Sequence, residues 1–205
     1  RLWPSWLRGR SPEQAGAAHN QRARLAGPAP FPDLAQQAST LSAVGALPKT
    51  TRKAPPARLS VDVPGRKWQQ IEAFASSLQF RQPTRHWLDW CAGKGHLGRL
   101  LAQDGQSLCC LEYNAELVEA GQRLSQRHGL QAEHRRQDVL CASTANHLQA
   151  EHTPVALHAC GDLHVRLLQL ASHTGCQQLA VAPCCYNRIQ GDSYQALSVA
   201  AQTST

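Results

Sequence analysis

Short apolar runs alternate with stretches of helical spacing along residues 66–184. The apolar runs predict five strands, over residues 86–91, 106–112, 131–138, 154–160 and 177–184. Apolar positions three and four residues apart predict helices over residues 66–79, 96–102, 114–129, 143–150, 163–174 and 190–201. Asn114 is a suitable N-cap for the third of these helices, and Gly129 is a suitable stop. Because strand and helix alternate, the pattern predicts a parallel sheet covered by helices on both faces.

The first third of the chain lacks this alternation and holds nine of the twelve prolines. Two stretches are typical of loops and linkers, namely GPAPFPD (27–33) and KAPPARLSVDVPG (53–65). The remaining pattern allows short helices over residues 13–26 and 33–46. We therefore predict a Pro/Ala-rich, linker-like segment over residues 1–64 and an α/β domain over residues 65–205.

The net charge of +7 belongs to the same first third. Residues 1–66 carry ten Lys/Arg and three Asp/Glu, whereas residues 67–205 carry eleven of each kind. A basic segment of this kind could bind RNA or another polyanion, or it could be a solvated flank. The charge therefore makes RNA a candidate partner without excluding the simpler interpretation.

Composition also bears on the compartment. No apolar run approaches the roughly 20 residues of a membrane helix, so we expect no membrane partner. The eight cysteines include two adjacent pairs, Cys109–Cys110 and Cys184–Cys185, that fit no small secreted disulfide framework. We therefore expect reduced thiols in the cytoplasm. The chain has no methionine and begins at Arg1, so we expect a fragment of a longer protein.

The most informative stretch is LDWCAGKGHLG, residues 88–98, which places glycines at positions 93, 95 and 98. This G-x-G-x-x-G spacing after a strand predicts a turn whose backbone N–H groups approach a nucleotide closely. Glu112 ends the second strand 19 residues after Gly93, where a carboxylate can accept hydrogen bonds from ribose hydroxyls. Both a dinucleotide and S-adenosylmethionine would suit these features.

Asp89 favours one of these two ligands. It lies four residues before Gly93, where its carboxylate would repel the phosphates of a dinucleotide. S-adenosylmethionine carries an ammonium and a sulfonium and no phosphate, so a carboxylate suits it. Asp138, at the end of the third strand, could then accept from the adenine amino group.

At this point the sequence resembles a known family. LDWCAGKGHLGRLL resembles the first motif of class I S-adenosylmethionine-dependent methyltransferases, CLEYN their second-strand acid and RRQDVL their adenine-side motif. ALHACGDLH (156–164) and VAPCCYNRI (181–189) resemble the methyltransferase domain of the glutathione S-transferase C-terminal-domain-containing protein and its bacterial and methyltransferase-like relatives. Some tRNA 2′-O-methyltransferases carry a similar His-x-Cys-Gly stretch.

The resemblance covers about residues 65–190 and implies a Rossmann-like class I fold with S-adenosylmethionine as the methyl donor. It implies a cofactor-binding set of Asp89, Cys91, Gly93, Lys94, Gly95, Glu112, Asp138 and His158. The family usually has two more strands after the fifth, for which the roughly 20 residues after Cys184 are too few. We therefore expect a sheet of about five strands, truncated at its C-terminal end.

Residues after the fourth and fifth strands usually face the methyl acceptor in this fold. His158, Asp162 and Tyr186 are therefore the candidate catalytic residues. Each has a simpler alternative: a buried strand histidine, a cap for the helix at 163, and a core tyrosine. The cysteines after the first, fourth and fifth strands should lie near one another, namely Cys91, Cys160, Cys184 and Cys185. No C-x-x-C spacing is present, so we expect no bound metal.

Three functions remain open from the sequence. The first is an S-adenosylmethionine-dependent methyltransferase with an unknown acceptor, for which RNA or tRNA is a candidate. The second is a catalytically inactive methyltransferase fold that serves as a binding module. The third is an NAD-type oxidoreductase, against which Asp89 argues. The Asn-Pro-Pro-Tyr motif of many amino-group methyltransferases is absent after the fourth strand, so the acceptor atom is not predicted.

Overall fold

The computed structural model describes residues 2–21, 25–43, 45, 54–103, 105–185, 187–192 and 195–203. The chain divides into two compact units, Arg1–Leu47 and Pro48–Thr205, and each is described by itself. Within the described ranges, no helix is long and apolar enough to cross a bilayer.

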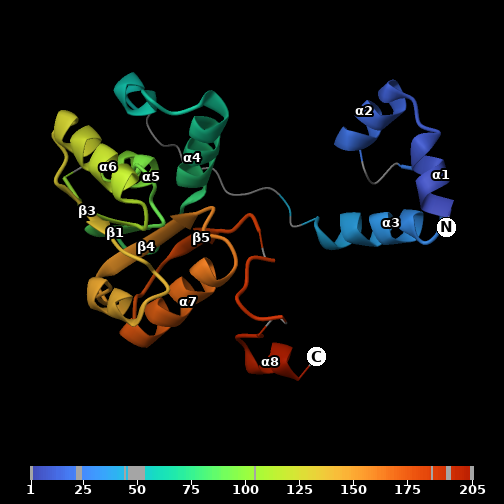
Figure 1. Ribbon diagram of the computed structural model, residues 1–205. Helices are drawn as coiled ribbons and strands as arrows, with labels where there is room; N and C mark the ends of the chain where they lie inside the picture. Colours follow the sequence, from blue (N-terminus) through green and yellow to red (C-terminus); the bar gives the residue numbers. More distant parts are fainter. Residues whose placement is uncertain are drawn as a thin grey trace. The chain divides into compact units, whose positions relative to one another are not determined.

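The first unit consists of three short helices in its described part, α1 (Leu2–Arg8), α2 (Pro12–Asn20) and α3 (Phe31–Leu41) (Figure 1). Trp3 packs edge-on against both Trp6 and Phe31, with ring centroids 5.5 Å apart in each pair. The short helices expected over 13–26 and 33–46 are confirmed as α2 and α3, although residues 22–24, 44 and 46 lie outside the described residues. Helix α1 was not predicted, and its Pro4 lies in the first turn, where proline is tolerated.

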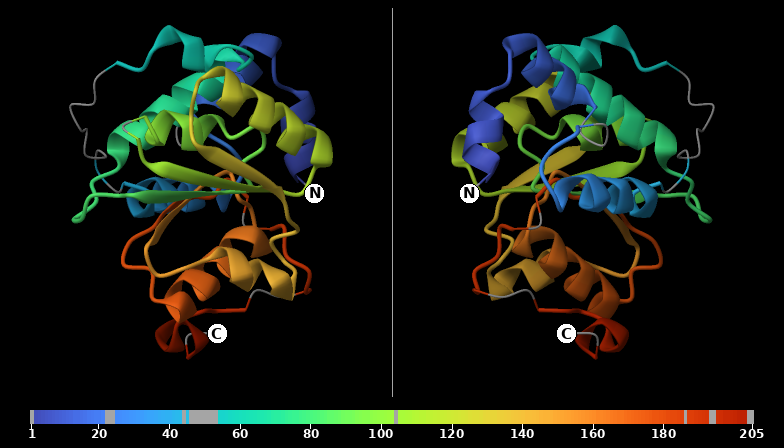
Figure 2. Two further views of the ribbon diagram at one scale, coloured as in Figure 1. Left: turned by 90° about the vertical axis from the view of Figure 1, so that its left-hand side faces the viewer. Right: turned by 90° about the vertical axis from the view of Figure 1, so that its right-hand side faces the viewer.

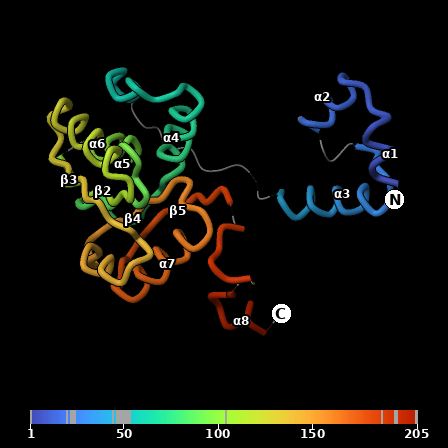
Figure 3. The backbone as a smooth tube through the Cα atoms, in the orientation of Figure 1, coloured from blue at the N-terminus to red at the C-terminus, as the bar shows by residue number. Residues whose placement is uncertain are grey.

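The second unit contains the predicted five-stranded parallel sheet. Its strands are β1 (His86–Trp90), β2 (Ser107–Glu112), β3 (Ala132–Arg136), β4 (His152–Leu157) and β5 (Ala180–Ala182). They lie in the order β3-β2-β1-β4-β5, and every neighbouring pair is parallel (Figures 1 and 3). The α/β fold prediction is therefore confirmed. The strand order reverses between β1 and β4, and ligands of such sheets bind beyond the carboxyl ends of the strands at this point.

Helices cover both faces of the sheet (Figure 2). On one face lie α4 (Gly65–Ser77), α5 (His96–Leu101) and α6 (Ala115–Arg127). On the other lie the 3₁₀ helix η3 (Ala142–His147) and α7 (Asp162–Thr174). Ile71 and Leu97 pack with Trp87 on the first face, and Leu167 packs with Trp90 on the second. Alternate residues of β1 thus supply both cores, as the period of a strand requires.

The predicted ends of α6 are also confirmed. The Asn114 side-chain oxygen accepts hydrogen bonds from the backbone N–H groups of Glu116 and Leu117, at 2.9 and 3.2 Å. Gly129 follows the helix with a φ of 66°, a conformation that residues with a Cβ adopt rarely.

Part of the predicted linker is folded. Residues Ala57–Ser60 form the 3₁₀ helix η2, whose Leu59 is 3% exposed and packs in the same core as α4 and α5. The division of the chain between residues 64 and 65 stays a prediction about domain organisation.

Several predicted boundaries are wrong. Strand β4 ends at Leu157 rather than 160, because His158 has a φ of 67° and cannot continue an extended strand. Strand β5 has three residues, since only these pair with β4. The helix expected over 143–150 is the 3₁₀ helix η3. The helix expected over 190–201 is reduced to α8 (Val199–Gln202), which begins where the Ser198 side chain caps it; residues 193 and 194 lie outside the described part.

Candidate functional site

The glycine turn between β1 and α5 combines close packing with an open side. A Cβ added to Gly95 would lie 2.6 Å from the His134 ring, and one added to Gly98 would lie 2.6 Å from a Leu108 methyl. These two glycines let α5 pack closely against β2. A Cβ added to Gly93 would meet nothing within 4 Å, although its φ of 56° disfavours any side chain. The backbone at Gly93 is thus exposed to an approaching ligand.

Asp89 is a buried carboxyl group at the foot of this turn. It is 2% exposed, and its Oδ2 accepts a hydrogen bond of 2.8 Å from the Gly98 backbone N–H. Burial raises the pKa of Asp89 to about 7, although the Gly98 amide and the Arg99 guanidinium favour the ionised form. Near neutral pH, a cation placed beside this carboxyl group would therefore fix its negative charge.

The Glu112 carboxylate connects the glycine turn to the start of α6 through two hydrogen bonds. Its Oε2 accepts from the Gly93 backbone N–H at 2.8 Å, and its Oε1 accepts from the Asn114 backbone N–H at 2.9 Å. A carboxylate oxygen has two lone pairs, so each oxygen keeps capacity for a second donor such as a hydroxyl. Glu112 is therefore positioned to hold the turn and to accept from a ligand beside it.

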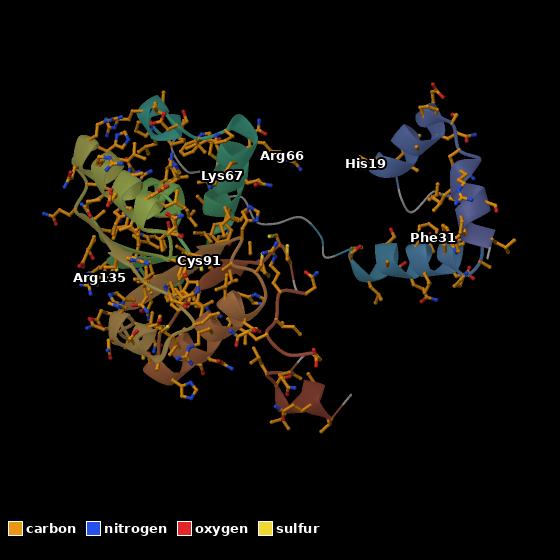
Figure 4. All side chains as sticks on the ribbon, in the orientation of Figure 1. His19, Phe31, Arg66, Lys67, Cys91 and Arg135 are labelled. Carbon is orange, nitrogen blue, oxygen red and sulfur yellow. The ribbon has the colours of Figure 1, made fainter. Side chains whose placement is uncertain are left out.

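The Cys91 thiol, labelled in Figure 4, lies near enough to three of the predicted acids for their charges to act on it. Burial, with smaller contributions from the charges of Glu112, Asp89 and Asp138, raises the pKa of this thiol to about 12. The acids at the ends of β1, β2 and β3 are thus all close enough to act on one sulfur. A thiol in this environment stays protonated at neutral pH and is not a nucleophile.

Asp138 lies in the loop after β3 and is partly used by that loop. Its Oδ1 accepts a hydrogen bond of 3.0 Å from the Leu140 backbone N–H, two residues on. This arrangement is an Asx turn, which fixes the direction of the carboxylate; the Cys141 thiol also bonds to this side chain, and a carboxylate can accept further donors.

A cleft opens at the reversal of strand order. Its volume is about 160 Å³, and residues after β1 and β4 line it together with α4 and α5. Of the predicted cofactor set, it is lined by Asp89, Cys91, Gly93 and His158, while Lys94, Gly95, Glu112 and Asp138 lie outside its lining. Ligand pockets usually enclose about 300–1,000 Å³, so the cleft would hold one part of a nucleoside-sized ligand. The rest would lie over the carboxyl edge of the sheet.

Helix α4 contributes polar residues that the sequence analysis missed. Lys67 lines the cleft, and its charge lowers the pKa of the Asp89 carboxyl group against the larger effect of burial. Figure 4 labels Lys67 on α4. Gln70, one turn further along, forms a hydrogen bond with His158. The helical pattern identified only the apolar face of α4, and no local signal marks these two polar positions.

His158 is exposed, so its interpretation as a buried strand residue is wrong. Its backbone has a φ of 67°, and its N–H donates to the Ala182 carbonyl oxygen at 2.9 Å. Its ring Nε2 lies 3.1 Å from Gln70 Oε1. Because a carbonyl oxygen only accepts, Nε2 carries the hydrogen in this arrangement. The neutral ring then has Nδ1 as the nitrogen that can take a proton.

His96, in the first turn of α5, is a neutral structural histidine. Burial, together with the nearby Arg99 charge, lowers its pKa to about 3. Arg99 Nη2 donates to His96 Nδ1 at 2.9 Å, which requires the unprotonated form of that nitrogen. His96 therefore does not exchange protons near neutral pH.

Asp162 is the first residue of α7 and does not cap it. The N-cap is Gly161, with no side-chain cap, so the predicted capping role is wrong. A Cβ on Gly161 would lie 1.6 Å from the Arg188 carbonyl oxygen, so only glycine fits there. The Asp162 Oδ2 accepts instead from the Gln190 backbone N–H at 2.7 Å and fixes the segment after β5. Tyr186, the third catalytic candidate, lies outside the described residues.

Three of the four cysteines expected to cluster do so. Cys160 Sγ lies 2.7 Å from Cys184 Sγ, which lies 3.6 Å from Cys185 Sγ. All three sulfur atoms lie within 4.8 Å of one another, and Cys91 is not part of this group. The proximity of the three follows from their positions after β4 and β5, two paired parallel strands whose carboxyl ends lie at the same edge of the sheet.

Comparison with known families agrees with this architecture. A family model described as "Methyltransferase domain" matches residues 66–192, more than half of the chain. A search of curated proteins finds no match. The finer resemblance to relatives of the glutathione S-transferase C-terminal-domain-containing protein stays a prediction. The matched region contains the parallel sheet, the glycine turn and the cleft, and the chain belongs to the methyltransferase domain family.

Proposed function

We propose that this methyltransferase uses S-adenosylmethionine as its methyl donor and binds it beside the glycine turn beyond β1. The observation that carries this proposal is the buried Asp89 carboxyl group under the open backbone of Gly93, with Glu112 bonded to the same turn. This arrangement suits a ligand with positive charge and ribose hydroxyls.

The residues present fit such a ligand. Asp89 would face its positive charge, Glu112 would accept from the ribose hydroxyls, and Asp138 would accept from the adenine amino group. Lys67 would pair with the carboxylate of the amino-acid part. When bound, S-adenosylmethionine supplies an electrophilic methyl group on a cationic sulfur.

The two other functions fit less well. A dinucleotide would bring its phosphates toward the Asp89 carboxyl group, and their charges would repel each other when that group is ionised. The family assignment also argues against an oxidoreductase. A catalytically inactive binding module would share the whole cofactor site, so binding alone does not distinguish it from an enzyme.

The acceptor side of the proposal rests on His158. Its Nδ1 can take a proton from an acceptor group while Gln70 holds Nε2. Asp162 would act by position, because its carboxylate fixes the segment that crosses the start of α7. Tyr186 remains a candidate to stack on a flat acceptor. We propose RNA as the acceptor class, on the ground of the basic first third of the chain.

Two measurements test the function. Calorimetry of the full chain should show binding of S-adenosylhomocysteine and none of NAD. Incubation with labelled S-adenosylmethionine and separate RNA, protein and metabolite fractions should transfer label to RNA. Binding of NAD in place of S-adenosylhomocysteine would contradict the donor assignment. Cofactor binding with no labelled fraction would favour the inactive module, and label in another fraction would overturn the choice of RNA.

A further inference from the structure

The thiol cluster beyond β4 and β5 is a chemically distinct group next to His158, which lines the cleft. Cys160 follows β4, whereas Cys184 and Cys185 follow β5, and their Sγ atoms lie within 4.8 Å of one another. Cys160 is 8% exposed, Cys185 is half-buried and Cys184 is exposed. The proposed methyl transfer uses none of these three thiols.

The backbone holds the two loops that carry the thiols together. The Gly161 N–H donates to the Cys185 carbonyl oxygen at 2.8 Å, and the Asp162 N–H donates to the Arg188 carbonyl oxygen at 3.1 Å. The approach is so close that only glycine fits at position 161. The sulfur atoms therefore converge on a fixed scaffold, which is what a binding site requires.

We propose that Cys160, Cys184 and Cys185 bind a thiophilic divalent cation, Zn²⁺, as three thiolate ligands. Tetrahedral zinc with Zn–S bonds of about 2.3 Å separates its sulfur ligands by about 3.8 Å. The Cys184–Cys185 separation of 3.6 Å is close to this value. The Cys160–Cys184 separation of 2.7 Å must widen by about 1 Å, which the exposed Cys184 side chain can provide by rotation.

Three thiolates leave the fourth zinc position to water or another exogenous ligand. Protein zinc sites with three protein ligands are of the open, catalytic kind, whereas structural sites supply all four. Cys160 Sγ lies 3.3 Å from the His158 carbonyl oxygen, so the cluster borders the residue proposed to receive the acceptor's proton. Among the described residues, no further His, Cys, Asp or Glu side chain belongs to the group formed by Cys160, Cys184 and Cys185.

Metal titration of the reduced, chelator-treated full chain tests the site. One Co²⁺ per chain should bind with thiolate charge-transfer absorption whose intensity corresponds to three sulfur ligands, and Zn²⁺ should displace it. Cys160→Ser and Cys184→Ser should each lower zinc affinity by on the order of 100-fold or more, because loss of a residue that only hydrogen-bonds a metal ligand already costs about 10–100-fold. Cys184 is exposed, so its variant keeps the test valid if the Cys160 variant fails to fold.

Cys176→Ser is the matched control. Its thiol lies beyond the other end of α7 and donates to the Gln149 carbonyl oxygen at 3.3 Å, so zinc affinity should stay unchanged. Absence of saturable cobalt binding, or unchanged zinc affinity in Cys184→Ser, would overturn the proposal. So would a disulfide between Cys160 and Cys184 in protein isolated with zinc present. No cofactor takes part in this test, so its result is independent of the proposed methyl donor.

Discussion

At the residue scale, Asp89 is a carboxyl group whose charge depends on its surroundings. Burial raises its pKa from 3.8 to about 7 in the folded chain. Between about pH 4 and pH 7 the folded state therefore binds more protons than the unfolded state, and the free energy of unfolding falls as the pH rises. The stability that the protonated Asp89 carboxyl group gives the fold is fully present below the unfolded pKa of 3.8 and is lost as the pH rises through about 7.

Asp89→Asn should remove this pH dependence. The asparagine oxygen can still accept from the Gly98 N–H, and the side chain carries no charge at any pH. Chemical denaturation between pH 4 and pH 7 gives the free energy of unfolding at each pH. In the wild type this free energy should fall more steeply with pH than in Asp89→Asn, by up to about 1.4 kcal/mol per pH unit. The exposed Asp192→Asn variant is the control and should follow the wild type. Equal slopes in all three proteins would contradict the raised pKa.

Glu112 accepts hydrogen bonds from the backbone of the glycine turn and is proposed to accept others from the cofactor. Two substitutions separate these two roles. Glu112→Ala should weaken S-adenosylhomocysteine binding by about 1–3 kcal/mol, because it leaves hydrogen-bonding groups unmet. Glu112→Gln keeps an oxygen for one of the two N–H donors and should lose less. Glu119→Gln, which changes an exposed pair with Arg123, should bind as the wild type does. Calorimetry that finds the alanine variant unchanged would rule out Glu112 as a cofactor residue.

His158 is expected both to border the cofactor and to take the acceptor proton. His158→Ala should slow turnover by roughly 10²–10⁴-fold, the usual contribution of a general base. Affinity for S-adenosylhomocysteine should change little. Gln70→Ala should have a smaller effect, since it removes only the hydrogen bond to Nε2.

The comparison of turnover with affinity decides between the two roles. Loss of both in His158→Ala would assign the residue to the cofactor pocket. Loss of neither would make His158 structural, and the acceptor side would then need another base.

At the element scale, Gly161 joins the end of β4, the start of α7 and the segment after β5. Gly161→Ala should destabilise the fold by several kcal/mol, because its Cβ would overlap the Arg188 backbone. Gly175→Ala is a matched control with a φ of 80° and open space around the added Cβ. It should lose only about 1–2 kcal/mol for its left-handed conformation. Urea denaturation that gave equal losses would show that the overlap relaxes easily.

Elements follow from the sequence better than the contacts between them. The strands, α6 and its cap were predictable because apolar period and capping residues are local properties. The end of β4 was not, since His158 adopts a positive φ under the influence of its hydrogen bonds. Lys67 lines the cleft and Gln70 contacts His158 only because α4 packs beside β1, and helical spacing does not determine that position. The proximity of Cys160, Cys184 and Cys185 was expected from the order of the strands, whereas the distances between their sulfur atoms depend on how two loops pack, 24 positions apart in the chain.

At the scale of the whole molecule, the net positive charge lies in the first third of the chain, whereas the α/β fold lies in the remainder. The region after residue 66 is balanced, with eleven residues of each sign, and it contains the cleft. Residues 1–53 hold eight of the Lys/Arg and two of the Asp/Glu, so they carry six of the seven net positive charges. The proposed RNA acceptor would therefore bind mainly through a part of the chain that contains none of the cleft residues. Binding and methyl transfer should then be separable.

Replacement of the eight Lys/Arg in residues 1–53 by Gln tests this separation in the full chain. Each phosphate contact contributes about −0.7 to the slope of log K against log salt for single-stranded nucleic acid, because bound cations are released. The wild type should therefore lose RNA affinity steeply as salt rises, whereas the substituted protein should bind weakly with a shallow slope. S-adenosylhomocysteine affinity should stay the same in both, since none of the eight replaced residues lines the cleft. If the substituted protein keeps both its RNA affinity and its salt slope, the basic segment is a solvated flank, and the acceptor must be recognised by the carboxyl edge of the sheet.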